Sequence, residues 1–145
     1  MTIVLFNPQW IIDQLKTEVT TLKRVSGAAG MAEAVEDLKQ TPAAFVVPAS
    51  ERPSGNSTGT MVVSQNNIVR FGVVIATQNL RDPRGEKAQA DLVALRGAIM
   101  TALHGWQPNA DFDPIEYGGG NLLKLDNQVL WWQDNFVTSH FIRSL

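Results

Sequence analysis

The stretch Ile68-Val69-Arg70-Phe71-Gly72-Val73-Val74-Ile75-Ala76-Thr77 decides the fold of this chain. Four of its odd-numbered positions are apolar and, in an extended strand, share one face of a sheet: Val69, Phe71, Val73 and Ile75. The segment 61–64 precedes this stretch, and Gln65-Asn66-Asn67 lies between them. Because asparagine tolerates the positive φ of tight turns, the pattern predicts a long β-hairpin whose turn is 65–67.

Two amphipathic helices are predicted to cover the sheet. The first spans about 8–21, with Asn7 as N-cap, Pro8 at the first helical position and Phe6 packed on Ile11. The second spans about 86–104, after a second cap-and-proline signal at Asp82-Pro83. Each has a buried stripe at helical spacing: Ile11, Ile12, Leu15, Val19 and Leu22 in the first, and Ala88, Leu92, Leu95, Ile99 and Leu103 in the second. We expect Ala94, Ala98 and Ala102 to let the second helix lie close to the sheet.

The remaining segments alternate between extended and helical patterns. Extended structure is predicted at 22–25, a short helix at 31–39, and a strand buried on both faces at the continuously apolar run 43–47. The polar run 48–60 predicts a long exposed and flexible loop. After Pro108, short extended pieces are expected with turns at Asp126-Asn127 and Asp134-Asn135: 115–117, 121–125, 129–132 and 136–143. The predicted fold is one α+β domain over 1–145, a mixed or mainly antiparallel sheet packed by two main helices.

Composition limits the function classes. The chain has 145 residues, with 12 basic and 14 acidic groups, so the net charge is 12 − 14 = −2. Neither half is basic enough for a nucleic-acid footprint, and the absence of cysteine excludes disulfides, a Cys zinc site and a Cys nucleophile. The start of the chain lacks a secretory signal and no apolar run is long enough for a membrane span, so we expect a cytoplasmic protein.

Candidate catalytic groups do not form a recognisable set. His104 falls at a helix end, where a capping role is favoured, and neither it nor His140 has a metal-spaced partner. A triad of Ser139, His140 and Asp134 fails because adjacent residues of a strand point to opposite faces. We therefore predict no catalytic residues and no cofactor.

Two further motifs have a structural and a functional interpretation. The acidic residues Asp111, Asp113 and Glu116 suggest a hard-cation site, but acidic loop residues are usually only solvated, so no metal is predicted. The run 118–120 is Gly-rich but lacks the lysine and the following helix of a phosphate loop, which favours a tight strand connection.

The densest aromatic region is Trp131-Trp132, followed by Phe136 and Phe141. Adjacent tryptophans in a strand face opposite sides, so either both are core or one meets a partner. The apolar hairpin face is likewise either a subunit interface or core beneath the 86–104 helix.

A set of residues in the second half of the chain carries a family resemblance: Trp106, the run Pro114-Ile115-Glu116-Tyr117-Gly118-Gly119, the run Val129-Leu130-Trp131-Trp132-Gln133-Asp134, and Phe136 with Thr138. This set resembles the tail terminator proteins of tailed bacteriophages and prophages. The similarity is to the branch found beside Mu-like tail genes and related in fold to the lambda-type terminator. It implies a non-enzymatic protein of the virion tail, made in the host cytoplasm. It further implies a hexameric ring that caps the tail tube, with the tail tube protein and a head-completion or connector protein as partners.

Three functions are compared on these grounds. A ring-forming virion protein is favoured over a monomeric binding or regulatory module of a prophage and over a small hydrolase. The residues expected at a subunit or tube interface are those of the hairpin face, the tryptophan pair and the loop: Arg52, Val69, Phe71, Val73, Ile75, Trp131 and Trp132.

Overall fold

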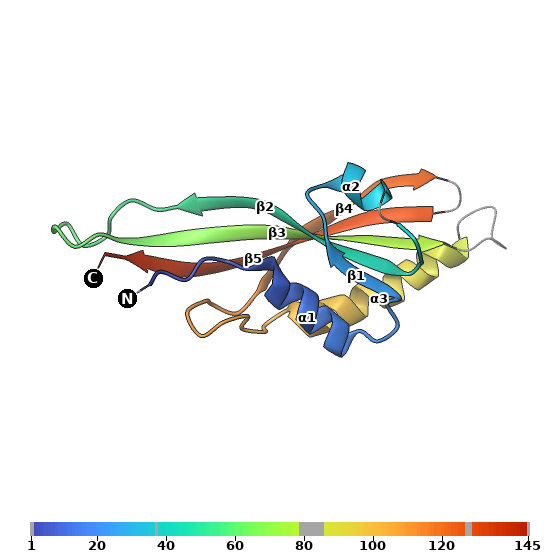
Figure 1. The fold of residues 1–145 in the computed structure, drawn as a ribbon, viewed down its shortest axis with the longest axis horizontal. Coiled ribbons are helices and arrows are strands. Elements are labelled where there is room, and N and C mark those ends of the chain that lie inside the picture. The colour runs from blue at the N-terminus through green and yellow to red at the C-terminus, as the bar shows by residue number, and fades with distance from the viewer. Residues whose placement is uncertain (1, 37, 79–85, 127–128, 145) are drawn as a thin grey trace.

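A computed structural model describes residues 2–36, 38–78, 86–126 and 129–144. The described chain contains three helices and five strands in the following order (Figure 1): α1 (Pro8–Glu18), β1 (Arg24–Gly27), α2 (Met31–Glu36), β2 (Ala43–Pro53), β3 (Ser64–Gln78), α3 (Glu86–Leu103), β4 (Glu116–Asp126) and β5 (Val129–Arg143). The predicted cap Asp82-Pro83 lies outside the described residues. No helix of the described part is both long and apolar enough to cross a membrane.

All five strands belong to one sheet in the order β1-β2-β3-β5-β4. Only β1 and β2 are parallel, and the other neighbours are antiparallel. The β3–β5 pair runs without a break from Ser64 opposite Arg143 to Gln78 opposite Val129. The predicted α+β fold with a mixed, mainly antiparallel sheet is confirmed.

The core has one apolar cluster on each face of the sheet. The larger cluster packs α1 and α3 on one face, where Ile11, Leu15, Ile99 and Leu103 are fully buried. Asn7 caps α1 as predicted, because its side-chain oxygen accepts a hydrogen bond from the Gln9 amide at 3.0 Å. A smaller cluster on the other face lies near α2: Ala28, Ala34, Ala43, Phe45, Val47, Val74, Ala76, Val129 and Trp131. The segment 43–47 is thus a strand buried on both faces, as predicted.

The predicted turn at 65–67 is wrong. These residues lie inside β3, and the chain reverses instead between Pro53 and Ser64. The predicted loop 48–60 is also too long, because β2 continues to Pro53. The segment 48–53 pairs with β3, and this pairing supplies hydrogen-bond partners for its backbone N–H and C=O groups. The polar composition of the segment does not indicate such a pairing.

The short pieces expected near the C-terminus merge into two long strands. Asp134-Asn135 lies within β5 rather than in a turn. The triple glycine 118–120 lies within β4, where the register against β5 shifts between Tyr117 and Gly120. It forms a bulge inside one strand and not a connection between strands, because Gly119 has a φ of +99° that lets the strand kink and continue.

The sheet extends well beyond the helices that cover it. We call this extension the arm; it consists of 50–53 of β2, 64–70 of β3 and 137–143 of β5. Figure 1 shows the arm projecting past α1 and α3, with both chain termini beside it. The tip of the arm is the connection 54–63, which Asn56 organises by accepting hydrogen bonds from the Thr58 and Ser64 amides.

Candidate assembly interface

The hairpin face that we considered for a subunit interface is core. Val69, Phe71, Val73 and Ile75 are at most 3% exposed, and all but Val69 belong to the cluster under α1 and α3. Phe71 stacks between Phe6, at 5.1 Å, and Phe136, at 5.6 Å between ring centroids. The expectation that these four residues contact another subunit is therefore wrong, because two helices suffice to cover them.

The tryptophan pair divides between the two faces of the sheet. Trp131 is 2% exposed and stacks on Phe45 in the smaller cluster. Trp132 is half-buried on the opposite face, at the margin of the larger cluster. Of the two, only Trp132 leaves part of its side chain exposed.

Asp134 is the centre of a polar cluster that joins three elements. Its carboxylate is fully buried, yet it accepts four hydrogen bonds. Arg96 of α3 donates Nε to Oδ2 at 2.9 Å and Nη2 to Oδ1 at 3.0 Å. Tyr117 of β4 donates its hydroxyl to Oδ1 at 3.0 Å, and Trp132 donates Nε1 to the same oxygen at 2.8 Å. A bidentate guanidinium with two neutral donors compensates the burial of the charge.

The contacts within this cluster shift the pKa values of Arg96 and Tyr117. The hydrogen bond from Arg96 to Asp134 raises the pKa of the guanidinium. Burial raises the pKa of the Tyr117 hydroxyl, and its hydrogen bond to Asp134 adds to the effect. Arg96 also lies 4.4 Å above the Trp132 ring, which holds both side chains flat against the sheet. The cluster therefore acts as a rigid clamp between α3, β4 and β5.

The glycine bulge makes room for this clamp. A Cβ atom at Gly120 would collide with the Asp134 carboxylate and lie 2.9 Å from Trp132 Nε1 and Tyr117 Oη. At Gly118 a Cβ would lie 3.3 Å from the Asn135 carbonyl. The triple glycine thus serves close approach of the β4 backbone to the buried carboxylate.

The margin of the sheet beside this clamp is open. β4 is an edge strand, so one side of its backbone has no strand partner in the described chain. Leu122 and Leu125 on β4 are 53% and 52% exposed, and Val93 on α3 is 66% exposed. Leu122 lies opposite Trp132 in the register, which places its side chain on the same face as the clamp. We call this surface the β4 margin. An open edge flanked by apolar and aromatic side chains is typical of a protein interface.

The three residues of the triad that the sequence analysis rejected are held apart. Ser139 donates its hydroxyl to Asp113 at 2.7 Å, whereas His140 points to the other face, 3.0 Å from the Asn67 amide nitrogen and stacked on Phe112. Burial lowers the pKa of His140, and the nearby carboxylates of Glu51 and Asp111 only partly oppose this. His104 follows the last residue of α3 and is exposed. Asp134 is engaged by Arg96, so the three triad residues do not meet.

Three exposed acidic residues border β5. Asp111, Asp113 and Glu116 lie along the segment that precedes and begins β4. Within the described ranges, no group of three or more histidine, aspartate and glutamate side chains is arranged to hold a metal ion. Arg52, the remaining residue expected at an interface, is exposed on the arm.

The arm tip carries exposed apolar side chains. Met61 is 97% exposed, and Val62 and Val63 are 40% and 39% exposed. The whole connection 54–63 has no charged residue. Its apolar end therefore lacks cover within the described subunit.

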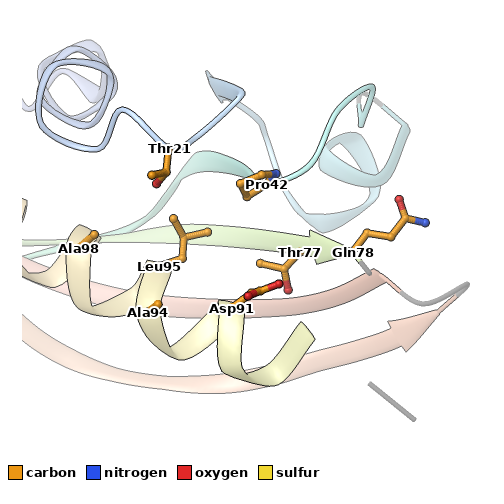
Figure 2. A pocket seen from close by; sticks show the side chains of 8 residues that line it. All are labelled: Thr21, Pro42, Thr77, Gln78, Asp91, Ala94, Leu95 and Ala98. Carbon is orange, nitrogen blue, oxygen red and sulfur yellow. The ribbon is translucent and has the colours of Figure 1, made fainter. Parts of the chain in front are cut away.

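A shallow apolar groove of about 480 Å³ lies at the other end of the sheet. Figure 2 shows Leu95 pointing from α3 toward Thr21 and Pro42, with Asp91 beside Thr77. Ala94 and Ala98 line this groove and are exposed, so only Ala102 of the three alanines is buried in the core as expected. Its lining also includes four polar side chains, Thr21, Thr77, Gln78 and Asp91.

Comparison with solved structures shows a related fold. The chain is similar in fold to a chain of the solved structure titled "Virion of native gene transfer agent (GTA) particle". The two share 15% identity over 93% of this chain and 94% of that one, with a TM-score of 0.56. No curated protein sequence matches the chain.

The model of the family described as "Phage tail terminator protein" matches residues 1–144. This family is one of structural tail proteins and not of enzymes. The chain therefore belongs to the phage tail terminator protein family.

Proposed function

We propose that this protein forms a closed homo-oligomeric ring that caps the tail tube. The ring ends tail elongation and provides the surface to which the head or connector protein joins. Six copies are expected on the strength of the family resemblance. Assembly takes place in the host cytoplasm, and the product is part of the virion tail.

The observation that carries this proposal is that the sheet is open at two different edges. The β4 margin is apolar and aromatic, whereas the opposite edge is formed by β1 and the outer side of β2 beyond Val46. A contact that joins two different surfaces of identical chains is heterologous, and such contacts close into rings when the rotation per subunit permits. The clamp around Asp134 presents Trp132 and Tyr117 in fixed positions, which lowers the entropy cost of binding.

The arm tip then projects from the ring. Its uncharged, apolar end is suited to a contact with the end of the tail tube, since neither helix covers it. This assigns the two kinds of contact to different parts of the chain: the sheet edges to neighbouring copies and the tip to the tube.

The test measures mass in solution by light scattering over a range of concentration. The wild-type protein should form a closed oligomer of constant mass, and Leu122→Asp with Leu125→Asp should give a folded monomer. Val35→Asp, at an exposed position of α2 on the opposite face of the sheet from the clamp, is the matched control and should assemble like the wild type. A wild-type protein that stays monomeric even when mixed with tail tubes would exclude the ring.

A further inference from the structure

One face of the arm, on which Arg52, Arg70 and Phe141 are exposed, carries an excess of positive charge, and we call it the open face. In the register, Arg52 lies opposite Ile68, and Arg70 lies opposite Ser50, so the two arginines are diagonal neighbours on one face. Arg143 of β5 is on the same face, opposite Ser64. The paired positions of the arm on this face include no acidic residue. Like charges so placed repel one another until an acidic partner approaches.

The margin on the far side of β5 carries the opposite charge. Between residues 105 and 123 the chain has three acidic residues, Asp111, Asp113 and Glu116, and no lysine or arginine. Asp113 and Glu116 line a groove of about 170 Å³ whose other walls include Ile68 and Val137. The lining also includes Asn66, Thr138 and Ser139, and Ser139 donates a hydrogen bond to Asp113 at 2.7 Å. The two carboxylates fit the guanidinium of an arginine, and the side chains of Ile68 and Val137 fit its stem.

Arg52 cannot enter this groove within its own chain. Arg52 is separated from the segment 111–116 by β3 and β5, and with strands about 4.8 Å apart this exceeds the reach of its side chain. Among the described residues, no ion pair joins Arg52 to a carboxylate. Arg52 and the two carboxylates therefore lie on opposite margins of the arm, as a heterologous contact requires.

We propose that Arg52 of one copy inserts into the groove between Asp113 and Glu116 of the next copy, so that neighbouring arms lie side by side. This inference rests on the proposed ring and names a specific contact within it. The contact continues the β4 margin along the same side of the sheet, since 111–116 leads directly into β4. Attraction between exposed charges would set the register of neighbouring subunits and would weaken as salt is added.

The experiment uses charge reversal on each side of the contact, with assembly followed by light scattering at low and physiological salt. Arg52→Glu alone and Glu116→Arg alone should each raise the concentration for half-assembly by at least about tenfold. An equimolar mixture of the two variants should assemble close to the wild-type concentration, because every contact in an alternating ring then joins opposite charges. Lys16→Glu, on the exposed face of α1, is the control for net charge and should leave assembly unchanged.

Circular dichroism confirms that each variant is folded before assembly is scored. The proposal is overturned if either single variant assembles like the wild type, or if both fail and their mixture fails as well. A wild-type protein that never assembles defeats the proposed function, and this contact with it. If the variant with Leu122→Asp and Leu125→Asp fails to assemble but Arg52→Glu assembles normally, the proposed ring stands. Only the contact of Arg52 with the groove is then rejected.

Discussion

The two halves of the sheet differ in what covers them. Near α1 and α3, the strands are sealed on one face by two helices and on the other by the cluster near α2, and Phe71, Val74 and Ile75 are fully buried. In the arm, the same strands continue with one face open, where Arg52, Arg70 and Phe141 are exposed. The comparison suggests that folding stability comes from the covered half and that the arm is left for contacts with other proteins.

The largest test of this comparison is Phe71→Asp in the covered half. Loss of a buried Phe side chain costs about 3–5 kcal/mol, and a carboxylate without partners in the core adds to that. Because domains are stable by only about 5–15 kcal/mol, the variant should be largely unfolded by circular dichroism. Ile68→Asp, on the open face of the arm, should remain folded. A folded monomer from Phe71→Asp would show that the residue faces a partner after all.

The clamp at the margin of the covered half gives the next largest effect. Asp134→Asn removes the buried charge that Arg96 requires and should lower the free energy of unfolding by about 2–3 kcal/mol, measured by urea denaturation. This loss of unfolding free energy is smaller than the loss expected for a fully buried ion pair, because the Arg96 side chain is 26% exposed. Asp126→Asn, paired only with Lys124 at the surface, should change stability by less than about 0.5 kcal/mol. Equal effects of the two substitutions would mean that the clamp contributes no stability.

These two halves were not equally predictable from sequence. In the covered half, the signals are local: Asn7-Pro8 marks the start of α1, and the apolar run 43–47 marks a strand buried on both faces. The type of each element and its buried residues can be predicted from such patterns, because the spacing of apolar residues along the chain depends on which face of a helix or strand is buried. The boundaries of α1 and α2 fall short of the predicted ones by up to three residues, as helix ends usually do.

The arm was mispredicted because its strands are stabilised by pairing and not by composition. The asparagines 66–67 look like a turn, yet Asn67 is 2% exposed and bound to His140 across the β3–β5 pair. The clamp was missed for a related reason. Asp134 resembles a turn residue until Arg96, which is far away in sequence, is brought to it by the packing of α3.

The pH dependence of stability tests the packing at the base of the arm. Burial lowers the pKa of His140 below its usual 6.5, so the unfolded chain binds a proton where the folded chain does not. The contribution of neutral, buried His140 to the free energy of unfolding is therefore fully present above about pH 6.5. It is lost as the pH falls through the lower pKa of the folded state. His140→Gln should flatten the rise in unfolding free energy between about pH 5 and 7. An unchanged slope in His140→Gln would show that this ring is open to water.

The smallest expected effect comes from Gly97 in the middle of α3, on the side away from the sheet. A Cβ at this position meets no atom within 4 Å, so alanine fits without strain. Because glycine loses more backbone freedom on folding, Gly97→Ala should raise the free energy of unfolding by about 0.5–1 kcal/mol. Gly120→Ala is the matched contrast, since its Cβ would collide with the Asp134 carboxylate and should destabilise the subunit. If Gly97→Ala stabilises the subunit but weakens assembly, the outer face of α3 belongs to a subunit contact; equal assembly would confine those contacts to the sheet edges and the arm.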